Sequence, residues 1–101
     1  MEDFVYYDQL FNIYGSLLNE SNRKYYRLYY EENFTLQEIA DLKNVSKSYV
    51  GNIISKTSKK LKEYENELHI LRDRNELIKI LSINDILEIK SMIKNMLNWW
   101  K

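Results

Sequence analysis

Apolar side chains recur every three to four residues along most of this chain, a spacing that predicts amphipathic helices rather than strands. The first predicted helix covers residues 4–18, and the polar stretch 19–22 then interrupts the pattern. A second helix is predicted over about residues 22–32. The positions expected to face inward are Phe4, Tyr7, Leu10, Phe11, Tyr14, Leu17 and Leu18 in the first helix and Tyr25, Leu28 and Tyr29 in the second.

The next segment predicts two helices separated by a short turn. Thr35 and Glu38 have the spacing of a capping box, in which the Thr hydroxyl and the Glu carboxylate each accept a backbone N–H at the start of a helix. The helix that they begin is short and ends near Lys43. Asn44 stands where the chain must turn, and Asn adopts the left-handed backbone conformation more readily than most residues.

Ser46 is the expected cap of the helix that follows the turn. A single apolar stripe continues beyond it, which predicts a long helix over about residues 47–66. The stripe consists of Val50, Ile53, Ile54, Thr57, Leu61, Tyr64 and Leu68.

The rest of the chain predicts a helical extension. One helix carries Leu71, Leu77, Ile78 and Leu81, and Ser82 or Asn84 is expected to cap a last helix that carries Ile86, Ile89, Ile93, Met96, Leu97 and Trp100. Together with the long helix, this extension has more apolar surface than one small domain can bury. We therefore expect a homodimer joined between about Leu71 and Trp100, with Trp99 and Trp100 packed against the domain or a second copy.

Composition supports an all-α fold of five or six helices without a sheet. A chain of 101 residues has room for a single domain, here divided into segments 1–34, 35–66 and 67–101. It has no proline and two glycines, too few turn formers for a β-sandwich or barrel. No apolar run approaches the roughly 18 residues of a membrane span, and the start is acidic, so we expect a cytoplasmic protein without membrane insertion.

The sequence offers no catalytic group, cofactor site or metal site, so we do not expect an enzyme. There is no cysteine, and the single histidine, His69, has no partner at ligand spacing. Two isolated glycines cannot form a phosphate-binding loop. The alternating Glu63, Glu65 and Glu67 are interpreted as a solvated face.

Charge is unevenly distributed along a chain whose formal net charge is zero. Residues 43–62 contain six lysines and no acid, whereas residues 1–20 contain four acids and no base. A basic stripe on a neutral domain is the electrostatic pattern of a nucleic-acid contact.

The two central helices have the features of a helix-turn-helix, in which the second helix enters the major groove of DNA. Ala40 is small enough for the second helix to cross over it, and a turn of three residues joins the helices. Asn52 is the candidate for base contact, Lys47 and Lys56 for phosphate contact, and Lys59 and Lys60 for the flanking phosphates. The full candidate set for DNA binding is Lys47, Ser48, Gly51, Asn52, Ser55, Lys56, Lys59 and Lys60.

About half of the chain, from Gly15 to Leu68, resembles region 4 of bacterial sigma factors, and more closely the small YlxM-type (UPF0122) proteins linked to the signal recognition particle operon. Two departures concern the second helix: Lys47 stands where the family has Arg, and Gly51 stands where it has an aromatic residue. The resemblance is carried by residues 11–18, Tyr29 and Tyr30, Leu36 to Ala40, Asn44 to Ser46, Val50 through Thr57 to Leu61, and residues 63–65.

The resemblance implies a DNA-binding regulator with a sigma region 4-like fold and an association with components of the signal recognition particle pathway. The alternative is a non-catalytic factor that uses the same scaffold to bind a protein or RNA of the targeting machinery. Stacking of RNA bases on the tyrosine-rich helices is a further alternative to their role as core.

Overall fold

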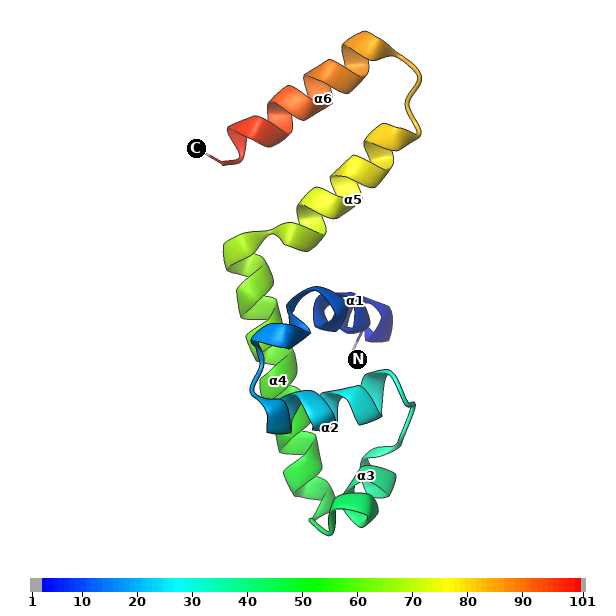
Figure 1. The fold of residues 1–101 in the computed structure, drawn as a ribbon, viewed down its shortest axis with the longest axis vertical. Helices are drawn as coiled ribbons and strands as arrows, with labels where there is room; N and C mark the ends of the chain where they lie inside the picture. The colour runs from blue at the N-terminus through cyan, green and yellow to red at the C-terminus, as the bar shows by residue number, and fades with distance from the viewer. Residues whose placement is uncertain (1–2, 101) are drawn as a thin grey trace. The chain divides into compact units, whose positions relative to one another are not determined.

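A computed structural model describes residues 3–100 of the chain (Figure 1). Within that range the chain forms six α-helices, one 3₁₀ turn and no strand, which confirms the all-α prediction. Its contacts divide it into two compact units, one ending at Leu68 and the other beginning at His69. The boundary lies close to the expected end of segment 35–66, and the treatment of the whole chain as one domain stays a prediction.

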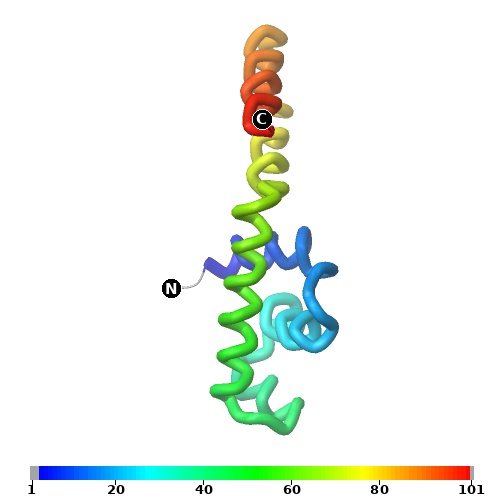
Figure 2. The backbone as a smooth tube through the Cα atoms, turned by 90° about the vertical axis from the view of Figure 1, so that its left-hand side faces the viewer, coloured from blue at the N-terminus to red at the C-terminus, as the bar shows by residue number. Residues whose placement is uncertain are grey.

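The first unit is built around one long helix. Figure 2 shows two shorter helices on one side of the N-terminal half of this long helix, while the opposite side of that half carries no other element among the described residues. The long helix has 22 residues and is the longest in this unit, as predicted. The four α-helices of the unit are α1 (Phe4–Tyr14), α2 (Glu20–Tyr30), α3 (Leu36–Lys43) and α4 (Lys47–Leu68).

The first helix ends earlier than its apolar pattern indicates. After Tyr14 the backbone tightens into a 3₁₀ turn over Gly15–Leu17, and Leu18 is extended and buried. Gly15 is also buried, and a Cβ atom there would lie 3.0 Å from the ring of Phe11. The close approach of this ring and the turn toward α2 replace the last helical turn that we predicted.

The second helix begins at Glu20 rather than Asn22, because the side chain of Asn19 caps it by accepting the N–H of Asn22 at 2.8 Å. Its deepest core residues are Tyr26 and Tyr30, not the predicted Leu28 and Tyr29, which are half-buried. Tyr25 is buried as predicted.

The core of the first unit forms where α1, α2 and α3 pack against α4. The apolar stripe of α4 is buried at Val50, Ile54 and Leu61, but Leu68 at its end is half exposed, so its predicted burial is wrong. Tyr14, in α1, contacts the ring of Tyr64 and the carboxylate of Glu65 on α4. These contacts lie about one helical turn before Leu68.

The second unit contains α5 (Ile70–Leu81) and α6 (Ile86–Asn98). Asp85, and not Ser82 or Asn84, caps α6 by accepting the N–H of Leu87 at 3.0 Å. Ser82 instead ends α5, where its hydroxyl donates to the carbonyl of Lys79 at 2.7 Å. His69, at the junction before α5, is half-buried and has a left-handed backbone with φ of 57°.

Candidate nucleic-acid interface

Three local structures define the start of α3, its end, and the start of α4 after the turn. The predicted capping box is present: the Glu38 N–H donates to the Thr35 hydroxyl at 3.1 Å, and the Thr35 N–H donates to the Glu38 carboxylate at 2.8 Å. Asn44 ends α3 in the left-handed conformation, with φ 56° and ψ 49°. The Ser46 hydroxyl then accepts the Tyr49 N–H at 3.1 Å at the start of α4. These contacts confirm the predicted helix, turn and helix.

Small and apolar side chains fill the angle between α3 and α4. Ile39, Ala40 and Val50 have at most 1% of their surface exposed. Val45 in the turn is half-buried, and its N–H donates to the Ala40 carbonyl at 3.0 Å. Ala40 is therefore buried where the sequence places the crossing of the two helices.

One strip of the exposed surface of α4 gathers four of the candidate residues. Because a helix turns by about 100° per residue, positions spaced by four, three and four residues share one side. All four side chains are exposed, and we call this strip the α4 lane; it consists of Ser48, Asn52, Ser55 and Lys59.

The other candidates lie at the edges of the α4 lane or away from it. Lys56 and Lys60 are exposed along one edge. Gly51 is half-buried on the side toward α3, and a Cβ there would lie 3.9 Å from the side chain of Leu36. Lys47 is exposed but lies about 140° around the helix from Asn52, beside Thr35 and Leu36.

A groove of about 490 Å³ lies between the start of α1 and the middle of α4, next to the α4 lane. Lys62 continues the lane by one more turn, and it belongs to the six-lysine stripe, so its helical spacing could have identified it. Tyr6 and Tyr7 could not be identified in this way, because they reach the groove only through the packing of α1 on α4. The groove is lined by Asp3, Tyr6, Tyr7, Ser55, Ser58, Lys59 and Lys62.

Tyr6 and Tyr7 lie side by side in this groove, and the hydroxyl of Tyr6 is a neutral hydrogen-bond donor at physiological pH. Their rings meet edge to face, with centroids 5.2 Å apart. Burial raises the pKa of Tyr6 above its usual value of 10.0, and electrostatic interactions with Glu65, Tyr7 and Asp3 raise it further. Asp3 caps α1 by accepting the Tyr6 N–H at 3.0 Å, so its carboxylate is held at the groove by the fold of α1.

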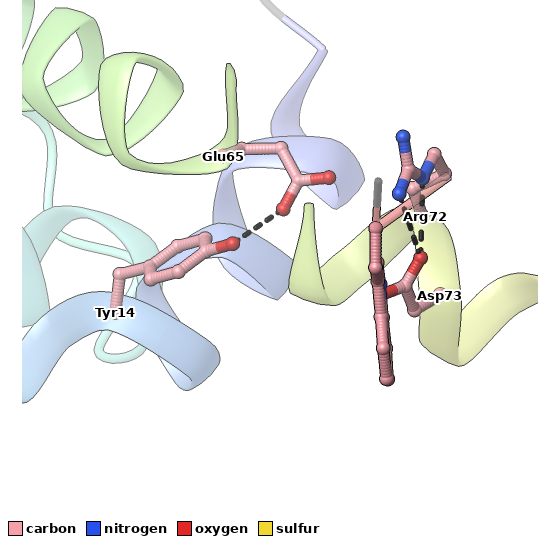
Figure 3. A network of polar contacts seen from close by, with 5 residues as sticks. Tyr14, Glu65, Arg72 and Asp73 are labelled. Atoms are coloured by element: carbon pink, nitrogen blue, oxygen red, sulfur yellow. Dashed lines mark hydrogen bonds and ion pairs between the residues drawn. The ribbon is translucent and has the colours of Figure 1, made fainter. Parts of the chain in front are cut away.

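Two buried hydrogen bonds join α4 to α1 and α2 behind the exposed strip. The Tyr14 hydroxyl donates to the Glu65 carboxylate at 2.6 Å (Figure 3), and the hydroxyls of Tyr26 and Ser58 lie 2.6 Å apart. Glu65 has 8% of its surface exposed, so its assignment to a solvated face is wrong. The helical stripe predicted the side of α4 that is buried, but not that a carboxylate on it would find a tyrosine 51 positions away.

The described residues contain neither a metal-binding cluster nor a membrane-spanning helix. Between residues 3 and 100 no group of three or more His, Asp or Glu side chains is placed to hold a metal ion. In the same part of the chain, no helix has the length and hydrophobicity needed to cross a membrane.

Taken together, the capped α3, the three-residue turn and the long α4 with one exposed polar side define a helix-turn-helix protein. The sequence profile of one family, described as "Putative helix-turn-helix protein, YlxM / p13 like", matches residues 1–98. The chain belongs to this family, UPF0122.

Several bacterial relatives carry the same family name. A UPF0122 protein of Mycoplasma mycoides is 37% identical over 105 residues, an alignment that covers 100% of this chain and 93% of the relative. One from Clostridium acetobutylicum is 38% identical over 81 residues, covering 78% and 70% respectively. One from Halalkalibacterium halodurans is 43% identical over 75 residues, covering 71% and 69%.

Proposed function

We propose that this protein binds duplex DNA, with the N-terminal half of α4 in the major groove. The observation that carries the proposal is the α4 lane, whose side chains are uncharged or basic and lie on the open side of the helix. The lane spans about 16 Å along the helix axis at 1.5 Å per residue. This length suits a groove about 12 Å wide that admits one helix.

Different side chains serve affinity and specificity in this proposal. Asn52 contacts a base edge. An amide that pairs with adenine through two hydrogen bonds contributes about 1–3 kcal/mol of discrimination against other bases. Lys56, Lys59 and Lys60 contact phosphates on one flank, and Lys47 contacts the backbone beside α3. Tyr6, Tyr7 and Lys62 extend the phosphate contact into the groove beside α1, because tyrosine hydroxyls are common donors to phosphate oxygens.

The dependence of DNA affinity on salt concentration gives a quantitative test of the proposal. If Lys47, Lys56, Lys59, Lys60 and Lys62 each neutralise one phosphate, the logarithmic slope of affinity against salt is about −4.5, and affinity falls roughly 500-fold between 50 and 200 mM salt. Removing two of these lysines makes the slope less steep by about 2. The measurement is a titration of fluorescent genomic fragments at several salt concentrations.

The variant Lys56→Ala/Lys59→Ala is compared with Lys24→Ala/Lys79→Ala, which removes the same charge from exposed positions of α2 and α5. We expect a flatter slope and weaker binding for the first variant only. Equal binding by both variants, or no binding by the wild type at low salt, refutes the DNA proposal. The alternative of a protein or RNA partner in the targeting machinery, which rests on family resemblance, would then take its place.

A further inference from the structure

The second unit is an antiparallel helical hairpin with a small interior. The start of α5 meets the end of α6, where the Trp100 indole N–H donates to the Asp73 carboxylate at 3.3 Å and the Arg72 guanidinium lies 4.4 Å from the centroid of the Trp99 ring. Arg72 also pairs with Asp73 at 3.1 Å (Figure 3). The buried apolar residues of this unit are Leu71, Ile80 and Met96.

Ten large apolar side chains of this hairpin are exposed among the described residues, and six of them lie on one side of it. The exposed fractions of these six range from 41% for Ile93 to 85% for Leu81. Taking about 200 Å² for a fully exposed large side chain, they present on the order of 700 Å² of surface. We call this set the hairpin face; it consists of Leu77, Leu81, Ile86, Ile93, Leu97 and Trp100.

The contributions of α5 and α6 to the hairpin face lie on the same side of the hairpin. Ile80 and Met96 are buried between the helices, and each is followed directly by an exposed leucine, Leu81 or Leu97. Both leucines are therefore turned by about 100° from the buried seam in the same rotational sense. In two antiparallel helices, an equal rotation away from the seam leads to the same face, so the two apolar strips are continuous.

We propose that the hairpin face is the dimer interface and that a second copy of this hairpin covers it, forming a four-helix bundle. The area fits, because a stable interface buries about 800 Å² on each partner. A folded unit of fewer than about 40 residues usually needs oligomerisation or a cross-link to be stable. A twofold dimer uses the same patch on both copies, so the hairpin face of one copy would pack against the hairpin face of the other.

The charges around the hairpin face give this dimer a distinctive salt response. Arg74, Lys90 and Lys94 are exposed beside the apolar strips, and a twofold dimer brings like charges together at its rim. Salt screens this repulsion and leaves apolar burial unchanged or stronger. Dimerisation therefore strengthens as salt rises, whereas binding of DNA phosphates weakens.

The test is sedimentation equilibrium of the full chain from low to high micromolar concentration, at low and moderate salt. The variant Leu81→Glu is compared with Leu87→Glu, because Leu87 is a leucine of the same hairpin, 77% exposed, that points away from the hairpin face. A glutamate in place of a leucine that is buried in an apolar interface weakens association by roughly 100-fold or more. We expect that loss for Leu81→Glu, a change of less than about threefold for Leu87→Glu, and unchanged helicity by circular dichroism for both.

Several results would overturn the proposal. A wild type that remains monomeric at high micromolar concentration contradicts it, as do equal effects of the two glutamate variants. Association that weakens as salt rises also contradicts it. Flotation of a monomeric wild type with anionic phosphatidylglycerol vesicles, abolished by Leu81→Glu, would assign the hairpin face to a lipid surface instead.

Discussion

Thr57 allows a sharp test of the packing between α4 and the helices that cover it. Its side chain has 1% of its surface exposed, and its hydroxyl oxygen has no hydrogen-bond partner among the described residues. A hydroxyl buried without a partner costs about 1–3 kcal/mol in mutational data. Val has nearly the same shape and a similar helix propensity, and it has no polar atom. Thr57→Val should therefore increase the free energy of unfolding.

We expect a gain of about 1 kcal/mol, which raises the melting temperature by about 4–8 °C for a domain of this size. Urea denaturation followed by circular dichroism measures the free energy of unfolding, and the slope m should not change. The matched control is Thr35→Val, the same substitution at the exposed cap of α3. It removes the 3.1 Å hydrogen bond from the Glu38 N–H and should decrease the free energy of unfolding by about 1 kcal/mol.

The prediction is that the same Thr→Val substitution increases the free energy of unfolding at Thr57 and decreases it at Thr35. If Thr57→Val leaves the urea midpoint unchanged or lowers it, the hydroxyl contributes favourably in solution, and the packing inferred around α4 is wrong at this point. If both variants are destabilised equally, the substitution acts through the helix backbone rather than through burial.

Two further substitutions test the contacts that hold α4 in place. Replacing the buried Ala40 by Leu should lower the free energy of unfolding by about 1–3 kcal/mol, because the larger side chain forces α3 and α4 apart. The variant should unfold at a lower urea midpoint and bind DNA more weakly. An unchanged midpoint would contradict the close crossing of the two helices. Tyr14→Phe removes the 2.6 Å hydrogen bond to Glu65 and should lower the free energy of unfolding by about 1.5–3 kcal/mol. The control Tyr49→Phe, at a half-exposed ring, should change it by less than about 0.5 kcal/mol. Equal effects of the two substitutions would refute a special role of the buried hydrogen bond.

Structures decided by a few neighbouring residues could be predicted from the sequence. The capping box of Thr35 and Glu38, the left-handed Asn44 and the cap at Ser46 each depend on hydrogen bonds within three or four positions. The all-α class and the long α4 followed from apolar periodicity in the same way. Spacings of three and four residues also fix one side of a helix, but the candidate set from the sequence included Lys47 and Gly51, which lie off the α4 lane.

Features that depend on packing between distant segments were decided by the tertiary structure. The end of α1, the half-exposed Leu68 and the buried Glu65 depend on how α1 and its Tyr14 meet α4. Periodicity marks which side of a helix is buried, but it contains no information about where the covering helix ends.

The candidate interface shows the same division. Spacing along α4 unites Asn52 with Lys59, and it also shows that Lys47 lies on another side of the helix. The groove that adds Tyr6 and Tyr7 exists only because α1 packs across α4, about 50 positions away in the chain. Local hydrogen bonds and helical spacing act within one element and can be read from the sequence, whereas a groove between two elements depends on the balance of many weak packing contacts, which only the folded chain establishes.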